Sequence, residues 1–157
     1  MEAEKLISVL NKKKLTIASV ESLTAGLFIA TLANVPGASK VVRGGLITYQ
    51  TSLKTNVLGI KPSVIKKYGV VSKEVATLMA KNGQKHLKSD IVVSFTGNAG
   101  PTKEPGGAEV GRVHIAILCK PNENLIKNFT KVYKASRNAI RKAVVKDAIR
   151  LVLEILK

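Results

Sequence analysis

The chain has 157 residues, 45% of them hydrophobic, which is typical of one domain with a buried core. Its single cysteine excludes an intramolecular disulfide, and no apolar run approaches either a signal peptide or the roughly 20 residues of a membrane span. The net charge of +16 would suit a nucleic acid, but basic residues are spread along the chain and only 4% of residues are aromatic, which favours an anionic small molecule.

Apolar periodicity and turn residues predict helices alternating with strands. In chain order these are a helix at 2–11, a strand at 15–20, a helix at 24–35, a strand at 41–50, short helices at 52–58 and 62–68, a helix at 72–87, strands at 90–95, 112–119 and 125–133, and a helix at 136–156. Alternation of this kind predicts a three-layer α/β/α sandwich. The tight turn at 121–124 requires an antiparallel pair, so we expect a mixed, mainly parallel sheet. We also expect a single domain over residues 1–157 and a location in the cytoplasm.

The first candidate site is the junction between strand 15–20 and the helix that follows it. Loops that leave the carboxyl ends of strands are the usual ligand sites of α/β sheets. Ser22 lies just before the helix, where unpaired backbone N–H groups can stabilise negative charge that develops beside its hydroxyl. The alternative, which spacing alone favours, is that Ser22 or Thr24 only caps the helix.

A serine nucleophile needs a general base, and the chain offers two histidines. His86 falls late in a predicted helix and is expected to be solvated, whereas His114 falls within a strand and can face either side. Lys54 and Tyr49 come close together after strand 41–50. A lysine serves as a base where burial and nearby positive charge lower its pKa well below about 10.4, although most lysines are surface residues.

The third candidate site is the segment 96–101, Thr-Gly-Asn-Ala-Gly-Pro, which follows a buried strand. Its glycines let backbone amides approach an anion closely, and the alternative is a surface loop with turn glycines. Arg137 and Arg141 are four residues apart on the last helix and share a face, which suits a phosphate or else a solvated basic surface.

These segments also match a set of known motifs in the same order. The match covers residues 21–26, 35–39, 44–49, 54, 58–59, 69–76, 96–101, 111–113 and 137–141. In this order they resemble the CinA C-terminal domain family, the nicotinamide-nucleotide amidohydrolases. The family's opening motif is Glu-Ser-Cys-Thr-Gly-Gly, and here Leu23 and Ala25 replace its cysteine and first glycine.

The resemblance implies hydrolysis of nicotinamide mononucleotide to nicotinate mononucleotide and ammonia, with no metal, no cofactor and self-association of the chain. It makes Ser22 the nucleophile and neutral Lys54 the base, with Tyr49 orienting Lys54 or relaying the proton. Backbone amides near Thr24 and Ala25 would hold the oxyanion.

The resemblance also implies a set of substrate-binding residues, with the phosphate of the substrate at Arg137, at Arg141 or at the loop that begins with Thr96. The set comprises Glu21, Thr24, Ala25, Gly26, Gly45, Thr96, Gly97, Ala99, Gly100, Arg137 and Arg141. Ala25 adds a methyl group where the backbone would approach substrate, so the main alternative is a nucleotide-binding module with a decayed site. A nucleic-acid-binding protein is a lesser alternative, and we expect none of the activity housed in the larger N-terminal domain that many CinA proteins carry.

Overall fold

A computed structural model describes all residues, 1–157, as six α-helices, one 3₁₀ helix and five strands. In chain order these are α1 (Glu2–Lys13), β1 (Ile17–Glu21), α2 (Leu27–Ala33), η1 (Ala38–Lys40), β2 (Val42–Ile47), α3 (Thr51–Asn56), α4 (Pro62–Tyr68), α5 (Lys73–Leu87), β3 (Ile91–Gly97), β4 (Arg112–Cys119), β5 (Leu125–Val132) and α6 (Arg137–Ile155). No helix is both long enough and apolar enough to cross a lipid bilayer.

The five strands form one mixed sheet in the order β2-β1-β3-β4-β5. Strand β1 runs parallel to both β2 and β3, whereas β4 is antiparallel to β3 and to β5. The carboxyl ends of the three parallel strands therefore meet at one edge, where Glu21 of β1 is level with Ile47 of β2 and Phe95 of β3. Residues that follow these three positions are brought together although they are far apart in the sequence.

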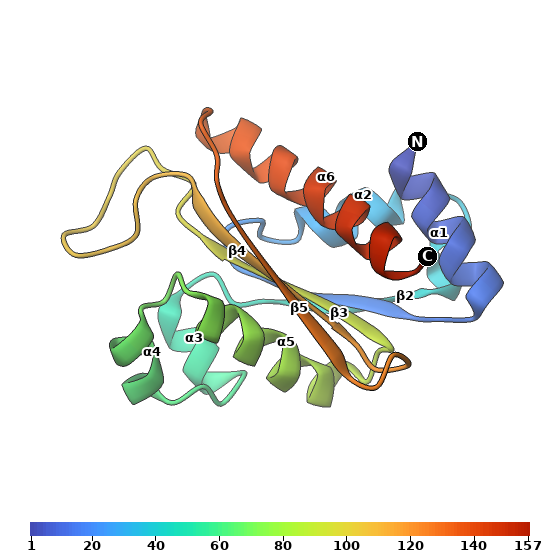
Figure 1. Ribbon diagram of the computed structural model, residues 1–157, viewed down its shortest axis with the longest axis horizontal. Coiled ribbons are helices and arrows are strands. Elements are labelled where there is room, and N and C mark those ends of the chain that lie inside the picture. Colours follow the sequence, from blue (N-terminus) through green and yellow to red (C-terminus); the bar gives the residue numbers. More distant parts are fainter.

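Helices cover both faces of the sheet, which confirms the predicted three-layer sandwich. Figure 1 shows α1, α2 and α6 on one face and α3, α4 and α5 on the other. The larger apolar core, of 25 buried residues, lies on the side of α1, α2 and α6, and a smaller core of 10 lies beneath α5. The few aromatic residues include Phe28 and Phe95, whose rings lie 5.3 Å apart within the larger core.

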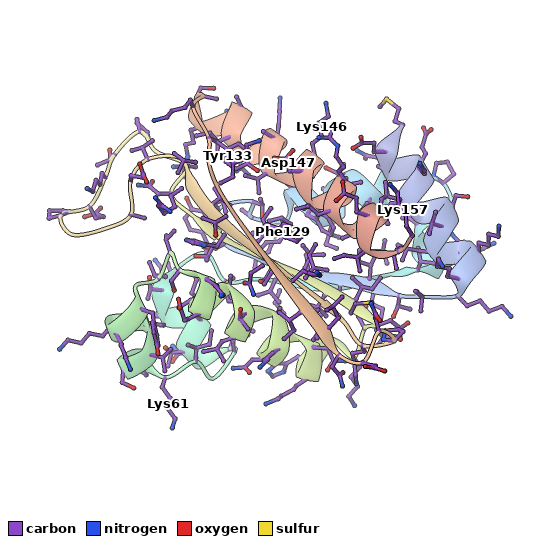
Figure 2. All side chains as sticks on the ribbon, viewed as in Figure 1. Lys61, Phe129, Tyr133, Lys146, Asp147 and Lys157 are labelled. Atoms are coloured by element: carbon purple, nitrogen blue, oxygen red, sulfur yellow. The ribbon has the colours of Figure 1, made fainter.

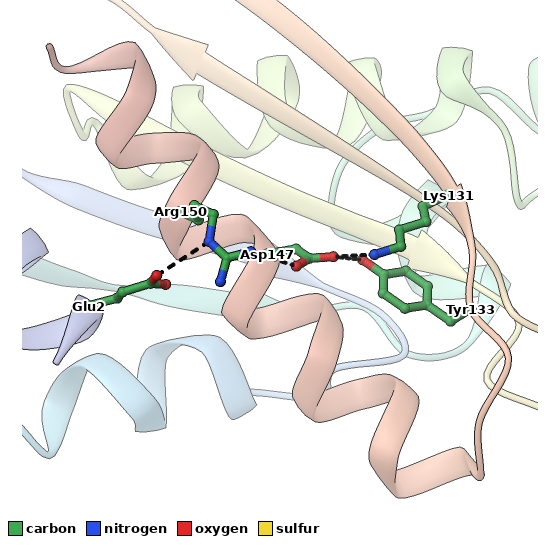
Figure 3. A network of polar contacts seen from close by, with 5 residues as sticks. All are labelled: Glu2, Lys131, Tyr133, Asp147 and Arg150. Carbon is green, nitrogen blue, oxygen red and sulfur yellow. Dashed lines mark hydrogen bonds and ion pairs between the residues drawn. The ribbon is translucent and has the colours of Figure 1, made fainter.

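A polar network fixes α6 against its neighbours at the surface (Figure 3). Asp147 of α6 accepts hydrogen bonds from the Tyr133 hydroxyl at 2.6 Å and from Lys131 Nζ at 3.2 Å. Arg150, one turn further along α6, reaches Glu2 of α1 with its Nε 3.3 Å from the carboxylate. Burial and the adjacent Asp147 carboxylate both raise the pKa of the Tyr133 phenol, so it remains a hydrogen-bond donor.

Most predicted elements are confirmed, with boundaries that differ by a few residues. Ser72 caps α5 as expected, because its Oγ accepts a hydrogen bond from Val75 N at 3.2 Å. The predicted helix at 24–35 is the main difference, since α2 begins only at Leu27. Ala25 and Gly26 have left-handed backbone angles, with φ of 48° and 95°, so the chain makes a turn there before the helix can start.

Candidate active site

The segment between β1 and α2 forms a tight turn that is held together by the buried carboxylate of Glu21. One carboxylate oxygen accepts hydrogen bonds from Gly26 N at 3.1 Å and Phe28 N at 3.0 Å. The other accepts from Ile29 N at 3.3 Å and from the Ser19 hydroxyl at 2.7 Å. Glu21 thus satisfies the open amides of the first turn of α2, a role that short polar side chains at the cap position usually fill.

The proposed helix-capping role of Ser22 or Thr24 is therefore wrong, because Gly26 holds the cap position of α2 and the Glu21 carboxylate accepts from the amides of the first turn. Glu21, expected to bind substrate, has all its hydrogen bonds inside the protein and is 1% exposed. Glu21 therefore supports the turn that carries Ser22, and its contact with substrate stays a prediction.

Ser22 and Lys54 come together at the carboxyl ends of the parallel strands. Lys54 lies on α3, which follows β2, and its Nζ is 3.1 Å from Ser22 Oγ. The same Nζ donates to the backbone carbonyl of Thr48 at 2.6 Å. When Lys54 is deprotonated, one of its two Nζ hydrogens can donate to this carbonyl. The Nζ lone pair is then available to accept the Ser22 hydroxyl proton.

The ammonium of Lys54 is removed from water without a counter-ion. Its side chain is 1% exposed, and no carboxylate lies within ion-pair distance of it. Burial therefore lowers the pKa of Lys54 from 10.5 to about 8, and a substantial fraction of the amine is neutral near physiological pH. The Glu21 carboxylate, adjacent to Ser22 in the sequence, faces the amides of α2 and leaves Lys54 without a counter-ion.

The turn beside Ser22 carries two backbone N–H groups that donate to no atom of the protein, those of Leu23 and Thr24. Both residues are buried, at 5% and 0% exposure. The next amide, that of Ala25, donates to Ser22 O at 3.0 Å, and that of Gly26 is taken by Glu21. Of the amides expected to bind the oxyanion, that of Thr24 is open and that of Ala25 is engaged, and the open amide of Leu23 is a further candidate, because an amide without a partner is available to an anion.

Arg141 of α6 holds the carbonyl side of the same turn. Its Nε donates to Leu23 O at 2.8 Å and its Nη2 to Thr24 O at 3.2 Å. In a trans peptide the N–H points opposite to the C=O, so this clamp directs the Thr24 N–H away from Arg141. The third donor group contacts Asn138 Oδ1 at 3.4 Å, so all three guanidinium nitrogens have partners within the protein, and phosphate binding by Arg141 stays a prediction.

Two buried hydroxyls, from residues that lie between Ser22 and Lys54 in the sequence, have no hydrogen-bond partner. They belong to Thr24 and Thr48, which are both 0% exposed. The Thr48 backbone is bound at both ends, by Glu21 O through its N–H and by Lys54 through its carbonyl. Buried hydroxyls are normally hydrogen-bonded, so this pair of orphans is typical of a site that a polar ligand completes.

A pocket of about 400 Å³ lies at the loop that follows β3, and neither Ser22 nor Lys54 lines it. The loop begins after Gly97, and the carbonyl of Phe95 in β3 accepts the Ser22 N–H at 3.2 Å. Arg137 lines this pocket and donates to Gly100 O at 2.7 Å and to the Tyr49 hydroxyl at 2.5 Å. The half-exposed Tyr49 is hydrogen-bonded to Arg137 and to neither Lys54 nor Ser22, so its expected role in orienting Lys54 has no direct contact to support it.

The predicted glycines and the other residues of the loop have mainly backbone roles. A Cβ at Gly45 would come within 2.6 Å of the Ser19 hydroxyl, so this glycine leaves room for the Ser19–Glu21 hydrogen bond, and its contact with substrate stays a prediction. Gly97 and Gly100 line the pocket beside Arg137. Ala99 is buried nearby at 5% exposure.

Thr96 donates its buried hydroxyl to Val70 O at 2.8 Å and is thereby held within the protein. Neither histidine reaches the pair. His86 is exposed as expected, and His114 bonds Thr130 through Nδ1 at 2.8 Å, with its pKa lowered first by burial and then by Arg112. No group of three His, Cys, Asp or Glu side chains could hold a metal ion.

The comparisons with known proteins agree on one family. The model of the CinA C-terminal domain matches residues 2–156. A competence-damage inducible protein of Listeria monocytogenes is 41% identical over 153 residues, which cover 98% of this chain and 36% of that protein. The chain therefore spans about a third of the length of the curated relatives it matches.

Solved structures share the whole fold. The competence/damage inducible protein CihA of Agrobacterium tumefaciens superposes with a TM-score of 0.92 at 27% identity, covering 100% of this chain and 97% of that one. A competence or damage-inducible protein of Enterobacter asburiae superposes with a TM-score of 0.94 over 99% of this chain and 96% of that one, at 22% identity.

Proposed function

The chain belongs to the CinA C-terminal domain family, and on that premise we propose that it hydrolyses the carboxamide of a nicotinamide nucleotide, with Ser22 as nucleophile and Lys54 as base. The observation that carries the proposal is the 3.1 Å contact between Ser22 Oγ and a buried lysine without a counter-ion. A serine beside a deprotonated lysine is an established arrangement for acyl transfer.

The reaction begins with neutral Lys54. Its amine removes the Ser22 hydroxyl proton as Oγ bonds to the carboxamide carbon, and the carbonyl oxygen becomes negatively charged. The open amides of Leu23 and Thr24 would hold this oxyanion, which they can do without reorganisation because the turn is already fixed.

Lys54 then returns the proton to the amide nitrogen, the carbon–nitrogen bond breaks, and ammonia leaves an ester on Ser22. Water attacks the ester with the same amine as base, the carbon–Oγ bond breaks, and the acid is released with the Ser22 hydroxyl restored. Each proton is taken up and given back by Lys54, which is consistent with a pKa of about 8.

Arg137 is the residue best placed for the nucleotide's phosphate. It lines the pocket beside Gly100, and the two hydrogen bonds that its guanidinium makes leave its Nε without a protein partner. A guanidinium binds phosphate through paired N–H donors, and Gly97 and Gly100 of the neighbouring loop add little side-chain bulk to the pocket.

Ammonia release from nicotinamide mononucleotide, nicotinamide riboside and nicotinamide tests the proposal. We expect release from the mononucleotide, less from compounds without the phosphate, and a loss of at least about 10³-fold in Ser22→Ala. Binding of the mononucleotide without any ammonia release would favour a binding module instead, and full turnover by Ser22→Ala would remove Ser22 from its role.

A further inference from the structure

A pocket unrelated to the Ser22–Lys54 pair opens between α1, α2 and α6. Its volume is about 600 Å³, within the range of about 300–1,000 Å³ that small-molecule sites occupy. The walls are apolar, formed by Leu27 of α2 and by Val145 and Ile149 of α6. Both α6 side chains also belong to the larger core, so this wall is a fixed part of the fold.

Basic side chains surround the apolar walls. Lys142, Lys146 and Arg150 are spaced four residues apart and therefore share one face of α6 at the rim of the pocket. Neither lysine makes a hydrogen bond or an ion pair within the protein. The only acid at the rim is Glu2, which already pairs with Arg150 (Figure 3).

We propose that this pocket binds a small-molecule anion with an apolar body, the size of a medium-chain acyl group or a two-ring aromatic. The body covers Leu27, Val145 and Ile149, and the anionic head is held by Lys142 and Lys146. Apolar burial supplies the binding free energy, and the two unpaired cations select for negative charge. A concave apolar floor of this size fits such a molecule better than it fits the extended, hydrophilic backbone of a nucleic acid.

The pocket also adjoins the elements that hold the catalytic turn. Leu27 begins α2, and its N–H donates to Thr24 O at 2.9 Å. Lys142 directly follows Arg141, which binds the carbonyls of Leu23 and Thr24. A ligand here therefore contacts α2 and α6, the two helices that fix the turn.

Titration with 8-anilinonaphthalene-1-sulfonate, a monoanion with an apolar aromatic body, tests the proposal on the folded full chain. We expect saturable binding with one site, weakened at least about tenfold by the pair Lys142→Glu and Lys146→Glu, which reverses the rim charge. The matched control is Lys61→Glu with Lys66→Glu, which makes the same charge change on α4, and Figure 2 places Lys61 on the opposite side of the molecule from Lys146. Equal affinity in the rim variant and the control variant would overturn the proposal.

Two further measurements separate the pocket from non-specific dye binding. Thr31→Trp places a large ring in the pocket, and because the chain has no other tryptophan, its fluorescence and melting curve report whether the variant is folded. We expect this variant to lose the dye site, and octanoate but not 1-octanol to displace the dye from the wild type. Displacement by both compounds equally would contradict the charge selection, and dye binding retained by folded Thr31→Trp would contradict the location.

Discussion

The two ends of the central sheet differ in whether their polar groups have hydrogen-bond partners. Where β1 and β3 begin, Thr16, Ser89 and Asp90 satisfy one another: the Asp90 carboxylate accepts from both Thr16 N and Oγ1, and the Thr16 hydroxyl oxygen accepts from Asp90 N and from the Ser89 hydroxyl. Where β1 and β2 end, the hydroxyls of Thr24 and Thr48 have no partner, and Lys54 is buried without a counter-ion.

The difference marks the functional end of the sheet. An unsatisfied buried polar group costs about 1–3 kcal/mol, so a fold keeps such groups only where something else requires them. In the whole chain only three buried side-chain oxygen or nitrogen atoms lack a partner. Two of them, on Thr24 and Thr48, belong to residues that lie between Ser22 and Lys54 in the sequence.

The largest loss of activity should come from replacing Lys54, the buried lysine without a counter-ion. Lys54→Met keeps the length of the side chain but removes the base, so we expect ammonia release to fall at least about 10³-fold with little change in KM. Lys85→Met, an exposed lysine near the opposite end of the sheet, is the matched control and should stay within about twofold of wild type. Steady-state kinetics measures both variants, and only a small loss of ammonia release in Lys54→Met would contradict the assignment of Lys54 as the base.

Stability gives a second readout for the same lysine. The pKa of Lys54 is about 8 in the folded chain and 10.5 when unperturbed, so between these values the unfolded chain binds more protons than the folded one. The free energy of unfolding should therefore rise from pH 8 to 10.5, and denaturant melts of Lys54→Met should lack this contribution. The same pH slope in both proteins would contradict the lowered pKa.

Loosening the turn without touching the reacting atoms should have an intermediate effect. Arg141→Gln removes the donors to Leu23 O and Thr24 O, so the open amides lose their fixed direction and we expect kcat to fall roughly 10–100-fold. Arg43→Gln is the control, because Arg43 also donates to a backbone carbonyl, that of Leu87, but does so outside the turn. If both variants lose kcat equally, the loss reflects general stability and not the turn.

The smallest effect concerns the strain at Ala25. Glycine adopts a left-handed φ without the penalty of about 1 kcal/mol that a Cβ brings, so Ala25→Gly should raise the free energy of unfolding by up to about 1 kcal/mol. Ala30→Gly, within α2, should instead lower it by about 1 kcal/mol, because glycine disfavours a helix interior. Thermal melts measure both, and the same sign of change in the two variants would contradict the assigned strain.

Much of the fold followed from sequence periodicity, because this chain alternates clear apolar strands with capped helices. Helix α4 and strand β4 have the predicted boundaries, since proline, glycine and charged residues mark their ends. The start of α2 was missed, because it depends on a carboxylate five residues before Gly26 and on a left-handed alanine. Local propensity carries no signal for such a contact.

The candidate site was only partly predictable for the same reason. Ser22 and Lys54 were named from a family resemblance, and the parallel pairing of β1 with β2 then brings them within 3.1 Å. The open amide of Leu23 and the clamp by Arg141 depend on tertiary contacts over more than 100 residues of chain, so no spacing rule could identify them. Glu21 was read as a ligand contact because its place beside the nucleophile does not reveal which way its side chain turns.

The pH dependence of ammonia release from nicotinamide mononucleotide tests the central assignment, a Ser22 nucleophile served by neutral Lys54, most directly. Because only the unprotonated amine can take the Ser22 proton, kcat/KM should rise about tenfold per pH unit below the lysine's pKa and level off above about pH 8. A rate that is flat from pH 6 to 9, or that falls as Lys54 loses its proton, would contradict the assignment.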